Sequence, residues 1–307
     1  MGWKVFLAIA ETCALFAVGG GGLRWGYIGR DDIARWSRFT FDVFTPCLTF
    51  SAIAGGLTRD KLASLWIMPV AGFSLMAAGA LLGLVLRPLL RCSTPERSAT
   101  FVHICAINNY IFLPLIVVEN LFGFGRHAAL LMVMNVGSTI GFWTIGVITL
   151  TGLRRDTLRS AVRQIYSVNI VAVAAAVAVV MWQIPVPPFV MKPIRTLGSI
   201  AIPLTLVLTG AALYRDAAGL LAHKADVAIV AAVRLLVIPA VFIAVLKLLP
   251  LPREIYEVCF IVALMPAAVS SALVARLYGG DGEFASQSVI TTTLLALATV
   301  PLLAKLI

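Results

Sequence analysis

The stretch AINNYIFLPL, residues 106–115, decides how this chain of 307 residues is interpreted. It lies within an apolar run long enough to cross a membrane, yet it carries two adjacent amides, Asn108 and Asn109, followed by Pro114. Proline removes a backbone donor and clashes with the preceding turn of a helix. In lipid the carbonyl groups freed by such a break need partners from protein or water. The stretch therefore predicts an interrupted membrane helix beside a cavity.

The composition supports a membrane setting for this stretch. Hydrophobic residues make up 61% of the chain and charged residues only 12%, whereas a soluble domain is about half apolar and about a quarter charged. We therefore predict an integral membrane protein of the all-α class. The short loops between the apolar runs and the lack of a targeting segment favour a bacterial inner membrane. The net charge of +10 is assigned to membrane topology rather than to nucleic-acid binding.

A membrane-spanning helix needs about 20 mostly apolar residues, and the sequence offers ten such segments. They cover residues 3–23, 35–56, 62–86, 98–118, 128–150, 161–183, 193–213, 225–248, 254–276 and 285–305. Ten spans place both termini on one side. Nine Lys and Arg residues fall on that side and fourteen on the other, so the positive-inside rule predicts that both termini lie outside and that the loop 151–160 is cytoplasmic.

Two pairs of similar segments indicate an internal repeat. TPCLTFSAIAGGL (45–57) resembles IPLTLVLTGAAL (202–213), and NNYIFLPL (108–115) is matched by ALMPAAVSSAL (263–273). Pro46 and Pro203 are 157 positions apart, and Pro114 and Pro266 are 152 apart. Because each half then holds five spans, the second half enters the membrane in the opposite direction. We expect an inverted 5+5 repeat, with halves at residues 1–153 and 154–307.

Interrupted helices in spans 4 and 9 predict a substrate site near the middle of the membrane. The N-termini of the second half-helices expose N–H groups and partial positive charge, which suit an anion. The side chains at both breaks add donors and acceptors. The predicted substrate-binding residues are Asn108, Asn109, Pro114, Pro266, Ser270 and Ser271. The alternative is a simple proline kink in which Asn108 or Asn109 bonds a neighbouring helix.

Charged residues within the spans suggest a second set of candidates, for a charge pair or a gate. Arg234 lies about ten residues into the eighth span, where a buried charge usually marks a pathway or a pair. It either contacts a substrate carboxylate or pairs with Glu11, Asp42 or Glu257. Asp42 also stands four residues after Arg38, which allows an i,i+4 pair. Glu11 is a candidate carrier of a coupling proton.

The chain resembles a known family, the auxin efflux carriers. The stretches that carry the resemblance are AINNYIFLPLIVVENLFG (106–123), IPLTLVLTGAAL (202–213), RLLVIPA (234–240) and LMPAAVSSALVARLYGGDGEFASQSVITTTLLALATVPLL (264–303). The resemblance implies a ten-helix fold with two crossing, proline-broken helices, and elevator-type transport of organic acids, mainly as anions. It also implies a homodimer through a scaffold of spans 1, 2, 6 and 7, with spans 3–5 and 8–10 as the transport unit.

The resemblance places Asn109 and Pro114 at the crossing on span 4 and Pro266 on span 9. This sequence departs from the family pattern at Tyr110 and Phe112, which are bulky where the family often has glycine, so the substrate is not carried over. The long cytoplasmic loop of the plant carriers is absent.

The sequence leaves other functions open beside that of a carrier of small organic anions. A sodium- or proton-coupled carrier of a bile-acid-like or other amphiphilic substrate stays open, as does a membrane sensor without transport. An enzyme would need a nucleophile with a base, or a metal cluster, and the sequence shows no HExxH or GxSxG motif. We therefore predict no enzymatic activity, no cofactor and no metal, with H⁺ or Na⁺ as the only candidate coupling ions.

Overall fold

The computed structural model describes residues 2–91, 94–152, 168–216 and 224–306, and these residues are helical apart from loops and one isolated β-bridge. The first half of the chain contains α1 (Gly2–Arg24), α2 (Arg30–Phe39), α3 (Thr45–Gly56), α4 (Ile67–Leu86), α5 (Pro95–Ala106), α6 (Phe112–Phe122), α7 (Arg126–Gly141) and α8 (Val147–Thr151). The second half contains α10 (Val168–Met181), α11 (Pro188–Asp216), α12 (Lys224–Ala232), α13 (Ile238–Lys247), α14 (Arg253–Ala263), α15 (Ser270–Leu277) and α16 (Gly282–Leu303).

Within the described residues, three short π-helical turns join consecutive helices without an intervening loop. They are η1 (Thr40–Phe44) between α2 and α3, η4 (Phe142–Gly146) between α7 and α8, and η6 (Val233–Val237) between α12 and α13. Such turns occur mostly as single bulges in α-helices and often at functional sites. Two of the three bear on the site described below, because η1 holds Phe41 and η6 holds Arg234.

Five of the described helices are long and apolar enough to cross a membrane. They run over Ile67–Leu89, Arg126–Thr151, Pro188–Arg215, Lys224–Lys247 and Gly282–Leu306, and shorter apolar helices cover Phe112–Phe122 and Val168–Met181. These segments agree with the prediction of an all-α membrane protein. The predicted loop 151–160 and the start of the predicted sixth span lie outside the described residues from position 153 onward.

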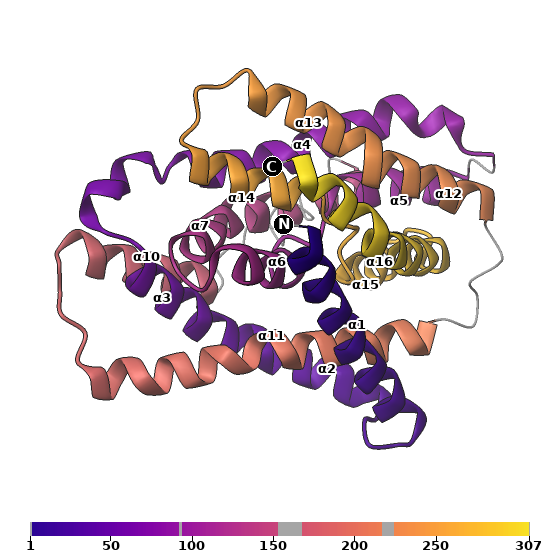
Figure 1. Cartoon of the computed structure of the whole chain (residues 1–307). Coiled ribbons are helices and arrows are strands. Elements are labelled where there is room, and N and C mark those ends of the chain that lie inside the picture. The colour runs from indigo at the N-terminus through magenta and orange to yellow at the C-terminus, as the bar shows by residue number, and fades with distance from the viewer. Residues whose placement is uncertain (1, 92–93, 153–167, 217–223, 307) are drawn as a thin grey trace.

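The helices pack in two groups. In the first, α1 crosses α11, and α3 packs against both α10 and α11 (Figure 1). In the second, α4 packs against α5 and α7, while α16 packs against α12, α15 and α5. The α3–α7 contact and the contacts of α1 with α6 and α16 join the two groups.

Glycine allows the backbones of α1 and α11 to touch. A Cβ atom at Gly19 would collide with the carbonyl group of Val207, and one at Gly210 would collide with the backbone of Phe16. The first group is therefore held by close backbone packing, as is common between membrane helices.

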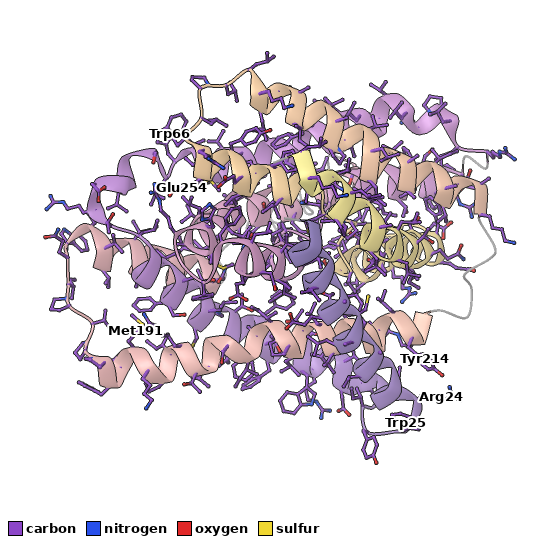
Figure 2. All side chains as sticks on the ribbon, in the orientation of Figure 1. Arg24, Trp25, Trp66, Met191, Tyr214 and Glu254 are labelled. Carbon is purple, nitrogen blue, oxygen red and sulfur yellow. The ribbon has the colours of Figure 1, made fainter. Side chains whose placement is uncertain are left out.

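Exposed aromatic side chains mark the two ends of the molecule. Trp25 and Trp66 are 74% and 67% exposed, and they lie at opposite ends in Figure 2, as do Tyr214 and Met191 near the two ends of α11. Tryptophan is enriched at membrane–water interfaces, so this arrangement indicates that α11 runs from one interface towards the other.

Candidate functional site

The first predicted break is present, and it lies just before Pro114. Helix α5 ends at Ala106, residues 107–111 are not helical, and α6 begins at Phe112. Pro114 is the third residue of α6. The N–H groups of the first turn of a helix have no intrahelical acceptor, so a proline there costs no hydrogen bond. Pro114 thus lies inside the second half-helix, and residues 107–111 form the break itself.

The second break lies between α14 and α15. Helix α14 ends at Ala263, and α15 begins at Ser270, with Pro266 in the link between them. The two links pair with each other as an isolated antiparallel bridge between Asn108 and Ala267. The N–H of Asn109 donates to the carbonyl of Pro266 at 2.8 Å, and the N–H of Ala268 donates to the carbonyl of Ile107 at 3.1 Å.

Side chains satisfy the carbonyl groups that the breaks leave free. The Asn108 amide donates through Nδ2 to the carbonyl of Val262 at 3.0 Å. Arg234 donates through Nε to Met265 at 3.1 Å, through Nη1 to Cys105 at 3.1 Å and through Nη2 to Ala263 at 3.4 Å. Because a buried carbonyl without a partner costs free energy, these bonds allow two interrupted helices to meet inside the protein.

The contacts of Arg234 differ from the charge pair that the sequence suggested. Its hydrogen bonds go to three backbone carbonyls, whereas Asp42 pairs with Arg38 at 3.4 Å, and Glu257 contacts His127 and Arg253, each at 2.8 Å. The described contacts of Arg234 thus include none of the three predicted carboxylates, and a gating role for these residues stays a prediction. The i,i+4 pair between Arg38 and Asp42 is confirmed.

A cavity of about 420 Å³ opens beside the paired links. One wall belongs to α2, η1 and α11, and the other to the two links and to α15 and α16. The first wall contributes Arg38, Phe41, Thr205 and Arg215. Phe41 touches Phe112, the first residue of α6, with ring centroids 5.6 Å apart. The cavity thus lies between the two groups of helices.

Three of the six predicted substrate-binding residues line this cavity, namely Asn108, Asn109 and Ser270. The N-termini of α6 and α15 also reach it, through Phe112 and Ser270. The other three, Pro114, Pro266 and Ser271, are buried and do not line the cavity.

The two adjacent asparagines are placed differently. Asn108 is 1% exposed and is held by its bond to Val262, while its Oδ1 atom has no hydrogen-bond partner among the described residues. The side chain of Asn109 is only half-buried, and no described residue bonds it. The hydroxyl group of Thr205, on the opposite wall, is likewise buried without a described partner. Buried polar groups normally have partners, so these atoms are suited to a bound solute or water.

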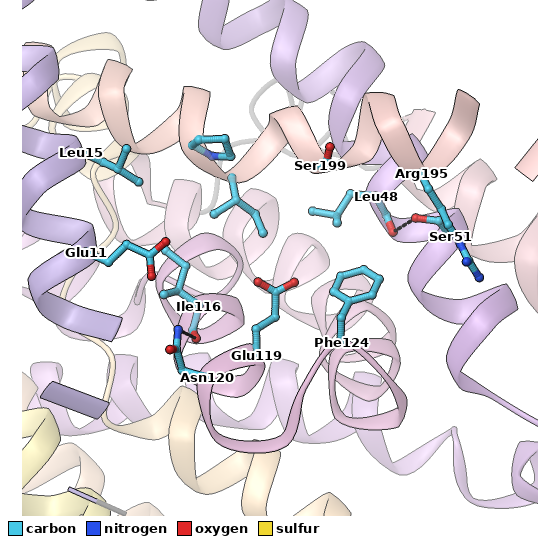
Figure 3. Close-up of a pocket in the computed structure, with 12 residues that line it drawn as sticks. Glu11, Leu15, Leu48, Ser51, Ile116, Glu119, Asn120, Phe124, Arg195 and Ser199 are labelled. Carbon is cyan, nitrogen blue, oxygen red and sulfur yellow. Dashed lines mark hydrogen bonds between the residues drawn. The ribbon is translucent and has the colours of Figure 1, made fainter. Parts of the chain in front are cut away.

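A second cavity of about 430 Å³ lies further along α6 and α11 (Figure 3). Glu11 of α1 and Glu119 of α6 point into it, and Arg195 of α11 lines it. The first cavity is lined by α11 residues from Thr205 to Arg215, and the second by residues from Arg195 to Pro203. The two cavities therefore follow one another along the same helices, and Glu11, a predicted candidate, belongs to the second.

Sequence reasoning missed a buried ion cluster that joins the starts of α5, α12 and α16. Arg97 bonds Asp281 at 3.0 Å and lies 3.5 Å from Asp226, and its guanidinium is 5.5 Å from the ring centroid of Phe284. Arg97 and Asp281 are 184 positions apart, so no local spacing could have revealed the pair.

A similar contact joins the starts of α7 and α14. Arg126 pairs with Glu254 at 2.7 Å, and His127 contacts Glu257. We call these two sets of contacts the Arg97 clasp and the Arg126 clasp. Each ties the start of an interrupted helix to a neighbouring helix from the other half of the chain.

Together these features define a class of protein, an integral membrane protein with interrupted helices that meet beside an internal cavity, as in membrane transporters. A family model described as membrane transport protein matches residues 4–167 and 157–304. The chain belongs to this family, the auxin efflux carriers, which confirms the resemblance. A search of curated protein sequences finds no match.

Proposed function

We propose that this protein is a secondary transporter that carries a small organic acid anion across a bacterial inner membrane. The observation that carries the proposal is the pairing of two interrupted helices beside a cavity of about 420 Å³. The N-termini of α6 and α15 at this cavity favour negative charge. Asn109 supplies an amide without a described partner.

The proposed architecture has ten spans in two inverted halves. Beyond the five long helices, the remaining spans would be α1, the continuous α2–η1–α3 helix, α10, and the interrupted pairs α5–α6 and α14–α15. The proposal is supported by the position of the breaks, because the links begin at Ile107 and Leu264, 157 positions apart, close to the offsets of 152 and 157 between the similar segments.

The proposed mechanism is elevator-type alternating access, in which one group of helices moves against the other. The division into a scaffold (α1, α2, α3, α10, α11) and a transport unit (the other helices) is supported by the packing of α1 and α3 on α11 and of α4 on α5 and α7. The substrate cavity lies between the two groups, which is where relative motion would change its access.

A homodimer through the scaffold and a topology with both termini outside remain predictions. Reporter fusions at the short loops test the topology, and the mass of the particle in detergent tests the dimer. A monomeric particle in lipid nanodiscs would contradict the predicted dimer.

A thermal-shift screen of the purified protein against small carboxylic acids tests the function. It is run with and without sodium, at pH 5.5 and 7.5. A ligand that binds the folded state raises the apparent Tm by mass action. We expect a carboxylate to raise the Tm of the wild type clearly more than that of Asn109→Ala at the same concentration. A screen in which no acid binds contradicts the proposal.

The second candidate is a sodium- or proton-coupled carrier of an amphiphilic substrate. The observation that favours it is the apolar lining of the cavity, which includes Leu206, Leu208, Leu213, Leu273, Val289 and Ile290. A Tm shift on adding sodium alone, or with a neutral amphiphile, would support this candidate over the simple anion carrier.

A further inference from the structure

Arg234 is a buried charge that pairs with no carboxylate among the residues that the structure describes. Its side chain is fully buried, with 0% exposure, and arginine stays charged in proteins. All three of its hydrogen bonds go to neutral backbone carbonyls at the ends of α5 and α14. A buried charge is normally paired, so the structure raises the question of what balances Arg234.

The two helix ends that meet at Arg234 offset its charge. A helix C-terminus carries roughly half a negative charge and a helix N-terminus roughly half a positive charge. The C-termini of α5 and α14 meet at Arg234, and together they offset about one positive charge. The N-termini of α6 and α15, which begin on the other side of the links, then remain without compensation. The region where the two links meet, which we call the crossing, is therefore left with an excess of about one positive charge.

Arg234 does not line the cavity, so it does not act by touching the solute. It acts through the links, because it bonds the carbonyl of Met265, and the next residue, Pro266, accepts the bond from the N–H of Asn109. Asn109 itself lines the cavity. The charge thus sits directly behind the wall that presents the two helix N-termini.

The other arginines at the cavity are less suited to select a charge. Arg38 is exposed to 86% and is paired with Asp42, so solvent and salt screen its field. Arg215 also lines the cavity, and it has an interaction partner of its own. The guanidinium of Arg234 is shielded from solvent, and within the described part of the chain its hydrogen bonds go to backbone carbonyls rather than to a carboxylate.

We propose that Arg234 makes the crossing selective for a solute with a single negative charge, by cancelling the two helix C-termini and leaving the two N-termini to the bound carboxylate. This inference rests on the proposed anion site. At an effective dielectric constant of about 20, two unit charges on the order of 10 Å apart interact by an amount that corresponds to roughly a tenfold change in affinity.

Matched pairs of a carboxylate and its primary amide test the proposal. The probes are benzoate with benzamide and hexanoate with hexanamide, and their affinities are measured on purified protein in nanodiscs. We expect the wild type to prefer the carboxylate of at least one pair. Arg234→Met should lower that preference roughly tenfold while leaving amide binding within about twofold, and Arg234→Lys should keep most of it. A purely structural role would weaken both probes equally.

A second variant keeps the test decisive if Arg234→Met does not fold. The side chain of Cys105 lies within electrostatic reach of Arg234, so Cys105→Asp gives the guanidinium a carboxylate partner with little change in volume. We expect this protein to fold and to lose the preference for carboxylates. Arg59→Met, which removes an exposed charge from the short helix η2 (Arg59–Ser64), should leave the preference unchanged.

Three results would overturn the inference. The first is a carboxylate preference that survives in Cys105→Asp, and the second is an equal loss for both members of a pair in Arg234→Met. In the third, the wild type binds acid and amide equally well. If the wild type binds no carboxylate at all, the anion site itself is wrong and the inference falls with it.

Discussion

The two interrupted helices meet at one point, but the two halves of the chain support them in different ways. On the side of the first half, α4 approaches with Gly79, where a Cβ atom would collide with the carbonyl of Cys105 and crowd Ala106. On the side of the second half, Arg234 of η6 donates to the same carbonyl of Cys105. The first half thus contributes a close backbone contact to the crossing, and the second half contributes the charge of Arg234.

The spacing of the similar segments makes this difference informative. Offsets of 152 and 157 place Arg234 opposite residues 77–82, AAGALL, which include Gly79 and no polar side chain. A strict two-fold repeat would carry either two arginines or none. Two buried arginines at one crossing would repel each other at high cost. If the halves are related as the similar segments predict, the buried charge at the crossing is a feature of the second half that the first half lacks.

The Arg97 clasp gives the largest expected effect on stability. The side chains of Arg97 and Asp226 are only 10% and 4% exposed, and that of Asp281 is 19% exposed. Arg97→Met should destabilise the protein by about 3–5 kcal/mol, because it leaves buried carboxylates without their cation. The apparent Tm in detergent measures this. Arg87→Met, an exposed position at the end of α4, serves as the control, and equal Tm values for the two variants would contradict the prediction.

Gly79→Ala tests the contact that the first half makes with the crossing. The new methyl group would meet the Cys105 carbonyl, which is backbone and cannot swing away. We expect a loss of about 1–3 kcal/mol in the free energy of unfolding. Gly20→Ala is the matched control, because its Cβ would make ordinary contact with Tyr214 at 3.4 Å. If Gly79→Ala leaves the free energy of unfolding unchanged, α4 does not pack closely against the crossing.

The two asparagines should separate into a structural and a binding residue. Asn108→Ala removes the donor to the Val262 carbonyl and should cost about 1–3 kcal/mol in stability, because that carbonyl is left unsatisfied. Asn109→Ala removes no described side-chain bond, so it should leave the Tm unchanged and weaken carboxylate binding roughly tenfold. Thermal unfolding with and without a carboxylate ligand distinguishes the two. The reverse pattern would exchange their roles.

Much of the fold and part of the site could be predicted from the sequence. Apolar runs predicted the class, and the pair of Pro114 and Pro266 placed both interruptions within a few residues, because proline acts locally. The partners of Arg234 could not be predicted, since its acceptors are backbone carbonyls, which every residue has. The same holds for Arg97 and Asp281, whose contact depends on how distant helices pack. Asn108 and Asn109 could not be told apart from the sequence, because both line the cavity and only the packing around them decides that Asn108 is buried and bonded to Val262 while Asn109 is half-buried.

The Arg126 clasp gives the smallest expected effect and sharpens the comparison of the halves. Arg126 and Glu254 are each about a third exposed, at 30% and 32% of the side chain, so their pair should contribute about 1 kcal/mol or less. Arg126→Met should therefore lower the Tm slightly at low salt, and the difference from wild type should vanish at high salt because the pair is screened. The lower Tm of Arg97→Met should persist at both salt concentrations, because its partners Asp226 and Asp281 are largely shielded from solvent. If the two variants respond to salt alike, the clasps are equivalent, and the asymmetry between the halves is confined to Gly79 and Arg234 at the crossing.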